Sequence, residues 1–89
     1  MIEKDLAIIN KLGLHARAAA KVVSVASRYS CTIQVEQGER LIDAKSIMGL
    51  LMLGAAKGTV LHVRVDGEDE QPAMDELADL FGRRFDEAE

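Results

Sequence analysis

The feature that most constrains the fold is a set of four short segments that each offer one apolar side to a second layer. Apolar and polar residues alternate within them, which is typical of half-buried β-strands. The segments are Ile2 to Ile9, Thr32 to Glu36, Arg40 to Asp43 and Thr59 to Asp66. Gln37-Gly38-Glu39 predicts a hairpin turn between the second and third segments. Strands of this kind predict a sheet that is covered on one face.

Three further segments have helical spacing. The first follows Gly13; one face of it carries only small or branched apolar residues, and another face is basic. The apolar positions are Ala16, Ala19, Ala20, Val23 and Ala26, and the polar ones are Arg17, Lys21, Ser24 and Arg28. We therefore expect the apolar set to face the sheet and the basic set to face solvent.

The other two helices carry recognisable end signals. Ser46 precedes an apolar run that Gly54 stops, which predicts a capped helix over residues 47–53. The last helix has Pro72 in an acidic first turn and one apolar face, made of Met74, Leu77, Ala78, Phe81 and Phe85. The sequence thus predicts a single α+β domain over residues 1–89, an open-faced two-layer sandwich of order βαββαβα. Three helices would cover one face of a four-stranded antiparallel sheet.

Composition excludes several classes of function. A net charge of -4 and an aromatic content of 3% argue against nucleic-acid binding. The single cysteine, Cys31, is predicted to be a small buried apolar residue in a reducing compartment. The acidic start of the chain is unlike a signal peptide, and the apolar run from Ile47 to Ala56 is too short to span a membrane. We expect a soluble cytoplasmic protein with no membrane contact.

The segment Gly13-Leu14-His15-Ala16-Arg17 places a histidine at the start of a helix. Unpaired N–H groups and the helix dipole favour an anion there, and Arg17 adds a cation. A neutral imidazole is a competent nucleophile near neutral pH. His15 is therefore a candidate phosphoryl acceptor, with the N–H groups of Ala16 and Arg17 receiving phosphate oxygens. The alternative is that His15 only caps the helix weakly.

Other candidate motifs are weaker. The strand pattern sends His62 to the polar side of its strand, where we expect a solvated residue, and nothing suggests a two-histidine metal site. Gly54 to Thr59 fails the phosphate-loop pattern because Lys57 precedes the second glycine. Without a nucleotide site or a cofactor, the chain would have to receive phosphate from another molecule.

The short helix after Ser46 is apolar nearly all round, so one sheet cannot bury every side chain. We expect Met48, Leu51 and Met52 to be partly exposed and to dock partner proteins. The alternative is that they all fill the core. Ser46 is predicted to cap the helix, and secondarily to be a regulatory phosphorylation site.

These residues resemble those of a known family. Leu12 to Arg17 is similar to the active-site signature of the HPr family, the histidine phosphocarriers of the phosphoenolpyruvate-dependent phosphotransferase system. Asp43 to Leu51 is similar to the regulatory-serine segment of that family, and the resemblance extends over essentially the whole chain. It implies an open-faced sandwich that acts as a phosphoryl carrier rather than a stand-alone enzyme.

The resemblance also implies roles and partners. His15 would take the phosphoryl group on Nδ1 from enzyme I and pass it to an EIIA-type protein, Arg17 would stabilise the phosphate, and a serine kinase would modify Ser46. Sugar-transport members usually carry proline where this chain has Ala18, and the segments Ala16 to Lys21 and Lys45 to Met48 are closer to the NPr type of the nitrogen-related branch. The alternatives are a sugar-uptake HPr, a regulatory binding module controlled by His15 phosphorylation, or a ligand-binding domain with a structural His15. We expect a monomer.

Overall fold

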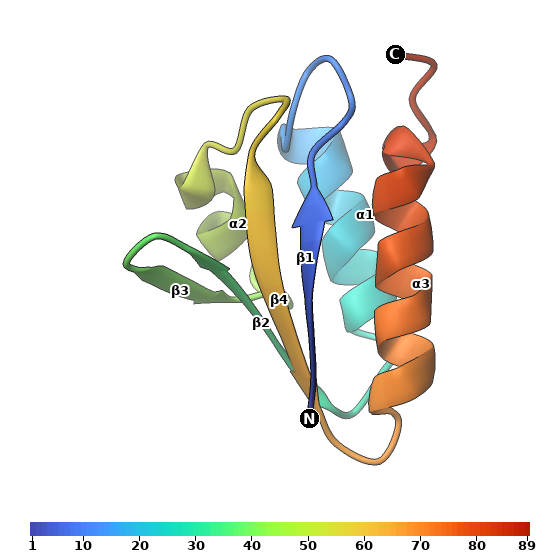
Figure 1. Ribbon diagram of the computed structural model, residues 1–89. Helices are drawn as coiled ribbons and strands as arrows, with labels where there is room; N and C mark the ends of the chain where they lie inside the picture. Colours follow the sequence, from blue (N-terminus) through green and yellow to red (C-terminus); the bar gives the residue numbers. More distant parts are fainter.

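The strands form one antiparallel sheet. The computed structural model describes residues 1–89 and contains β1 (Ile2–Ala7), β2 (Thr32–Gln37), β3 (Arg40–Asp43) and β4 (Val60–Asp66). Their order across the sheet is β1-β4-β2-β3, so the first and last strands lie side by side (Figure 1). Asp5 pairs with His62, and Val35 pairs with both Ile42 and Val63.

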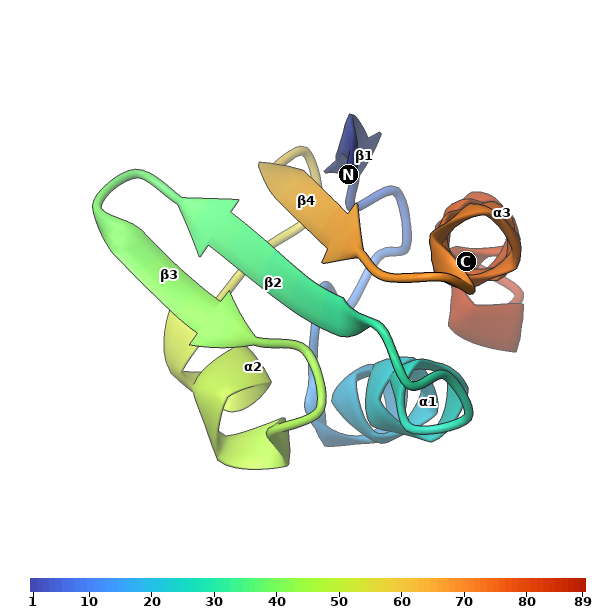
Figure 2. The ribbon, with the colours of Figure 1, turned by 90° about the horizontal axis from the view of Figure 1, so that it is seen from below.

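All three helices cover the same face of the sheet, as Figure 2 shows. They are α1 (Ala16–Ala26), α2 (Ile47–Leu53) and α3 (Glu70–Gly82), and a short 3-10 turn, η1 (Arg84–Asp86), follows α3. None of the helices combines the length and the apolar composition needed to cross a membrane. The predicted class, the element order and the one-sided covering are confirmed.

The core lies between the sheet and the helices. The inward side chains of β2 and β4 are fully buried, and alternate residues of these strands face solvent, as the period of two requires. The buried strand residues are Ile33, Val35, Leu61, Val63 and Val65. Cys31 is also buried, and this burial raises the pKa of its thiol to about 11. It is the small buried residue that the sequence predicts.

The predicted buried face of α1 is partly wrong. Ala18, Ala19, Val22, Val25 and Ala26 are buried, whereas Ala16 and Ala20 are exposed and Val23 is half-buried. A run of alanines carries little contrast between faces, so the orientation of α1 follows its larger apolar residues, which gain more from burial. The predicted basic face is confirmed at the exposed side chains of Arg17 and Arg28.

The last predicted helix ends earlier than its apolar pattern indicates. Phe85 was expected on the apolar face of that helix, but α3 ends at Gly82 and Phe85 lies in η1. Arg84, Phe85 and Asp86 all have positive φ, at 58°, 54° and 65°. This backbone is unfavourable for residues other than glycine, and the fully buried Phe85 ring, 4.9 Å from the Phe81 ring between centroids, offsets the cost.

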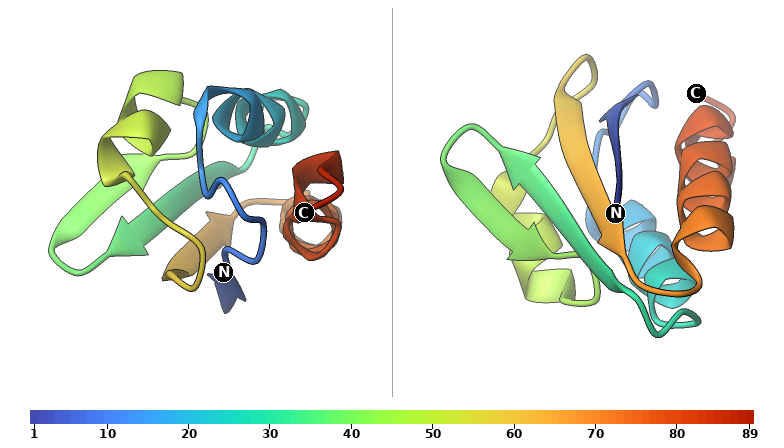
Figure 3. Two further views of the ribbon diagram at one scale, coloured as in Figure 1. Left: turned by 90° about the horizontal axis from the view of Figure 1, so that it is seen from above. Right: turned by 60° about the horizontal axis from the view of Figure 1, so that its bottom comes forward.

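The turn at η1 sends the C-terminus toward the start of α1. The β1–α1 loop and the C-terminus lie at the same end of the molecule (Figures 1 and 3). The backbone N–H of Lys11 donates to the carbonyl of Glu89, and the ammonium of Lys11 lies 3.5 Å from the Glu89 carboxylate. Segments at opposite ends of the sequence therefore form one surface around the start of α1.

Candidate functional site

A tight loop delivers His15 to the start of α1. Gly13 has a φ of +72°, and a Cβ there would lie 2.5 Å from the carbonyl oxygen of Ala55, so the position requires glycine. The next residue, Leu14, is buried, and its N–H donates to the same carbonyl at 2.8 Å. The loop is thus attached to the segment that follows α2, and this attachment fixes where α1 begins.

His15 is the N-cap residue of α1, and its side chain makes no capping hydrogen bond. The first intrahelical donor to its carbonyl is the N–H of Ala19, at 2.8 Å, so the preceding N–H groups of the first turn have no intrahelical acceptor. The His15 side chain is 28% exposed. An anion beside this ring meets unpaired backbone donors, as the sequence predicts.

The C-terminal segment places a carboxylate against the His15 ring. Nε2 of His15 is hydrogen-bonded to one oxygen of Glu87, and the amide of Asn10 donates to the other oxygen at 2.8 Å. These bonds hold the pKa of the Glu87 carboxyl below its ordinary value, the Asn10 bond most and the His15 bond next. Asn10 is fully buried, and its amide also donates to the carbonyl of Gly13 at 2.8 Å.

Arg17 lies beside this arrangement and faces solvent. It lines an open hollow of about 520 Å³ together with Lys11, Lys21 and residues 85–89 of the C-terminal segment. Lys21, on this face of α1, and Arg28, just beyond the C-terminal end of α1, form salt bridges with carboxylates, whereas the guanidinium of Arg17 forms none. The predicted basic face therefore leaves one cation free, and that cation is next to His15.

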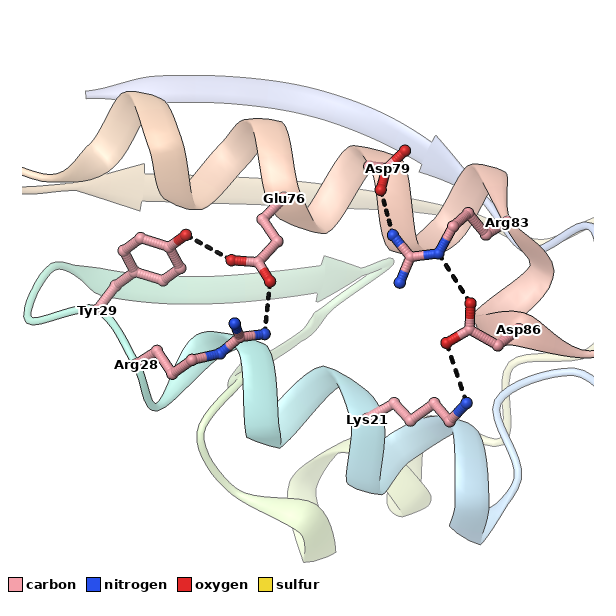
Figure 4. A network of polar contacts seen from close by, with 7 residues as sticks. All are labelled: Lys21, Arg28, Tyr29, Glu76, Asp79, Arg83 and Asp86. Atoms are coloured by element: carbon pink, nitrogen blue, oxygen red, sulfur yellow. Dashed lines mark hydrogen bonds and ion pairs between the residues drawn. The ribbon is translucent and has the colours of Figure 1, made fainter.

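Polar contacts between α1 and the C-terminal helix hold the C-terminal turn in place (Figure 4). The Asp86 carboxylate accepts hydrogen bonds from Nζ of Lys21 at 3.1 Å and from Nε of Arg83 at 2.8 Å. These two cations lower the pKa of the Asp86 carboxyl to about 2, Arg83 more than Lys21. Farther along, Glu76 of α3 accepts hydrogen bonds from both Arg28 and Tyr29 at 2.5 Å.

The short helix α2 presents the predicted apolar side chains to solvent. Met48 and Met52 are 66% and 67% exposed, and Leu51 is 37% exposed. Ser46 caps the helix as expected, because its hydroxyl accepts the N–H of Gly49 at 3.2 Å. The loop of His15 is bonded to Ala55, just beyond the other end of α2. Ser46 therefore caps the end of α2 opposite the end that adjoins Ala55.

His62 lies on the open face of the sheet, as its strand pattern predicts. Its Nδ1 is 2.7 Å from Asp5 and its Nε2 is 2.7 Å from Glu3, both on the neighbouring strand β1. These hydrogen bonds raise the pKa of the His62 ring, the Glu3 bond most. Both ring nitrogens are thus occupied, and no helix start or free cation lies beside the ring.

Sequence reasoning missed two residues of the site, Asn10 and Glu87. Asn10 stood in a loop rich in turn residues, and Glu87 was one of several acidic residues near the end of the chain. The contact between His15 and Glu87 spans 72 positions, and no local pattern records such a separation. In the structure, the full burial of Asn10 points to this arrangement, because a buried polar side chain needs hydrogen-bond partners.

Comparison with known proteins assigns the chain to a family. The family model described as "PTS HPr component phosphorylation site" matches residues 2–83. Phosphocarrier protein HPr of Pseudomonas aeruginosa is 54% identical over 86 residues, with 96% of each chain covered. Phosphocarrier protein NPr of Shewanella violacea is 41% identical over 87 residues, with 98% of this chain and 96% of the relative covered. The crystal structure of HPr-C-His from Thermoanaerobacter tengcongensis superimposes with a TM-score of 0.96 at 43% identity, and both chains are covered completely. The chain therefore belongs to the HPr family of phosphocarrier proteins of the phosphotransferase system.

Proposed function

We propose that His15 receives a phosphoryl group from a phosphorylated enzyme I, itself charged from phosphoenolpyruvate, and passes it to an EIIA-type protein. The observation that carries the proposal is the position of the His15 ring at the unpaired N–H groups of α1, with Nδ1 free of protein partners and Arg17 beside it. Phosphoryl transfer needs alignment and charge stabilisation more than further covalent machinery. Both requirements are within reach of this small site.

The phosphate-binding groups would be the N–H groups of Ala16 and Arg17 and the guanidinium of Arg17. Helix-start N–H groups point toward an anion, and an arginine offers two parallel donors to two phosphate oxygens. The site is solvent-exposed, so phosphate is held without being enclosed, and a carrier must release what it accepts. The same exposure lets two different proteins reach the ring in turn.

We propose that partner proteins dock on the exposed apolar side chains of α2, namely Met48, Leu51 and Met52. Flexible methionines adapt to more than one partner surface, and a carrier needs at least a donor and an acceptor. Phosphorylation of Ser46 by a serine kinase would place negative charge at the start of this helix and reduce docking. The protein would act as a monomer, which sedimentation of the free chain tests.

For the branch of the system, we propose the nitrogen-related one. The support is Ala18, a buried residue of the first turn of α1, where sugar-transport members usually carry proline. Proline is favourable in a first turn but not required, so phosphoryl transfer does not depend on it. The second candidate, sugar uptake, is favoured by the higher identity to a relative named HPr than to the one named NPr.

The experiment is a phosphoryl-transfer assay read by intact mass. The chain is incubated with phosphoenolpyruvate and either the sugar-branch or the nitrogen-branch enzyme I, and an EIIA-type protein of either branch is then added. We expect one acid-labile phosphoryl group, gained faster from the nitrogen-branch donor and lost to the nitrogen-branch acceptor. Faster exchange with the sugar-branch pair would select the second candidate. A phosphorylated chain that binds partners stoichiometrically but transfers nothing would indicate a regulatory module instead.

A further inference from the structure

We infer that Glu87 is a positioning residue, which holds the His15 ring by Nε2 and leaves Nδ1 as the nitrogen that reacts. The inference rests on the proposed function, because it assigns a role in the chemistry of that same ring. It goes beyond the matched family model, which ends at residue 83. The side chain of Glu87 is only 12% exposed, so its contact with His15 is not a loose surface pair.

Glu87 is itself held in place on several sides. Asn10, fully buried, donates to its second carboxylate oxygen at 2.8 Å. The preceding residues are anchored by the buried Phe85 ring and by the contacts of Asp86 with Lys21 and Arg83. A carboxylate that is held by a buried amide and by the residues that precede it restricts the movement of the ring to which it is hydrogen-bonded. Three consecutive residues with positive φ bring the chain to this position.

The contact decides which ring nitrogen keeps the hydrogen. An ionised carboxylate only accepts hydrogen bonds, so the Nε2 that faces Glu87 must carry the hydrogen. In a neutral imidazole the lone pair is then on Nδ1. Nδ1 has no protein partner, and His15 is the residue directly before the unpaired N–H groups of the first turn of α1. The nucleophilic nitrogen is therefore selected before a donor arrives.

The same carboxylate balances charge during transfer. The Nδ1 lone pair forms a bond to phosphorus while the bond from phosphorus to the donor breaks, and the donor keeps that electron pair. The ring then bears the phosphoryl group on Nδ1 and the original hydrogen on Nε2, with one positive charge that Glu87 neutralises. When the acceptor attacks phosphorus, the electron pair of the Nδ1–P bond returns to Nδ1. No proton has to leave or enter the ring in either step, so neither step needs a general base.

The chain offers a matched control for Glu87. Glu89 lies in the same C-terminal segment, but its side chain contacts Lys11 and not His15. The substitutions Glu87→Gln and Glu89→Gln remove the same charge from the same segment, and Glu87→Ala also removes the hydrogen-bond acceptor. A general effect of tail charge would appear in all of them, whereas a specific hold on Nε2 would appear only at position 87.

The test combines imidazole NMR of the unphosphorylated chain with phosphoryl acceptance from enzyme I. In wild type and Glu89→Gln we expect a downfield, slowly exchanging Nε2–H proton, phosphorylation on Nδ1, and equal rates. In Glu87→Gln the proton should move upfield and the rate should fall roughly tenfold, because a charge-assisted hydrogen bond is lost. In Glu87→Ala the Nε2–H signal should disappear into exchange, with an equal or larger loss of rate.

Three outcomes would overturn different statements. If wild type accepts the phosphoryl group but Glu87→Gln and Glu87→Ala keep its rate and its Nε2–H signal, Glu87 has no positioning role and the proposed function stands. If wild type accepts no phosphoryl group from either enzyme I, the proposed function falls, and the chemical role of Glu87 falls with it. Phosphorylation of wild type on Nε2 would overturn the inference alone.

Discussion

The two histidines of this chain both lie against carboxylates, yet only one has the surroundings of a phosphoryl acceptor. His62 is held between Glu3 and Asp5 on the open face of the sheet, and each ring nitrogen has a carboxylate at 2.7 Å. His15 meets a carboxylate on Nε2 alone, and its other nitrogen is free. A histidine bound on both nitrogens has no lone pair to offer, whereas one bound on a single nitrogen is oriented and still reactive.

The elements that present the two rings differ as well. His62 is on β4, where strand dipoles largely cancel and the neighbouring side chains are mostly acidic. His15 stands at the positive end of α1, beside an arginine with no protein partner. An incoming phosphate would be repelled at the first ring and attracted at the second. The difference between the histidines is thus one of position in the fold and not of residue type.

The largest expected effect comes from removing each histidine in turn. His15→Ala should abolish phosphoryl acceptance from enzyme I, because the nucleophile is lost. His62→Gln should leave acceptance at the wild-type rate, because His62 has no free nitrogen and lies on another face. Intact mass after incubation with phosphoenolpyruvate and enzyme I measures both. A fully active His15→Ala protein, or an inactive but folded His62→Gln protein, would break the comparison.

The second prediction removes the cation from the surroundings of His15. Arg17→Ala should slow phosphoryl acceptance by roughly tenfold to a hundredfold, because a group that stabilises the transferring phosphate is lost. The fold should be unaffected, since Arg17 is exposed and has no protein partner. The measurement is the single-turnover rate of phosphoryl transfer from enzyme I.

Arg28→Ala is the matched control for Arg17→Ala. It removes the same charge, but Arg28 lies beyond the other end of α1, where it contacts Glu76. We expect a wild-type transfer rate and a slightly lower stability toward urea, because exposed ion pairs contribute little. Equal losses of rate in the two variants would mean that overall charge, and not the position of Arg17, governs transfer.

The sequence predicted the parts of this site that local chemistry determines. Gly13, His15 and Arg17 are close in the chain, and a helix start follows from their order, so their arrangement did not depend on distant contacts. The caps of α2 were equally local, since Ser46 bonds to Gly49 and Gly54 takes the left-handed conformation that ends the helix. Strand alternation also placed His62 on the correct face of β4.

What the sequence could not predict depends on contacts between distant segments. The orientation of α1 follows from its packing against the neighbouring helices α2 and α3, and its alanines gave too little contrast to show it. Phe85 continues the helical spacing of the last segment, but the chain turns at η1 because burial of its ring and the contacts of Asp86 stabilise the turn. The partner of the His15 ring, Glu87, depends on that turn.

The third prediction introduces a negative charge, like those that surround His62, at the start of the proposed docking helix α2. Ser46→Asp should weaken binding to enzyme I by roughly tenfold, because the new charge must be desolvated beside an apolar contact. Aspartate is itself a good N-cap residue, so α2 should keep its structure. Calorimetric titration with enzyme I gives the dissociation constant.

Gln34→Asp provides the control for Ser46→Asp on the open face of the sheet. Gln34 is exposed on β2, and its strand neighbour Arg64 already donates hydrogen bonds to the carboxylates of Glu3 and Glu36. An added negative charge there should leave the affinity for enzyme I unchanged. If both variants bind equally well, or lose affinity equally, α2 is not the docking surface.

The smallest expected effect concerns stability, and it distinguishes the two rings without a partner protein. The carboxylates of Glu3 and Asp5 raise the pKa of His62 in the folded chain, and Glu36 and Arg64 also face this ring. A raised folded pKa stabilises the fold fully below the unfolded pKa of about 6.5, and this contribution is lost as pH rises through the folded value. The difference in unfolding free energy between wild type and His62→Gln should therefore shrink as the pH is raised from about 6 to about 9. Urea unfolding at a series of pH values measures it.

Glu3→Gln removes the largest cause of the shift, so in that background the His62→Gln difference should depend less on pH. A difference that stayed constant over this range would show that the carboxylates do not favour the protonated ring, and the contrast with His15 would then rest on the helix start and Arg17 alone.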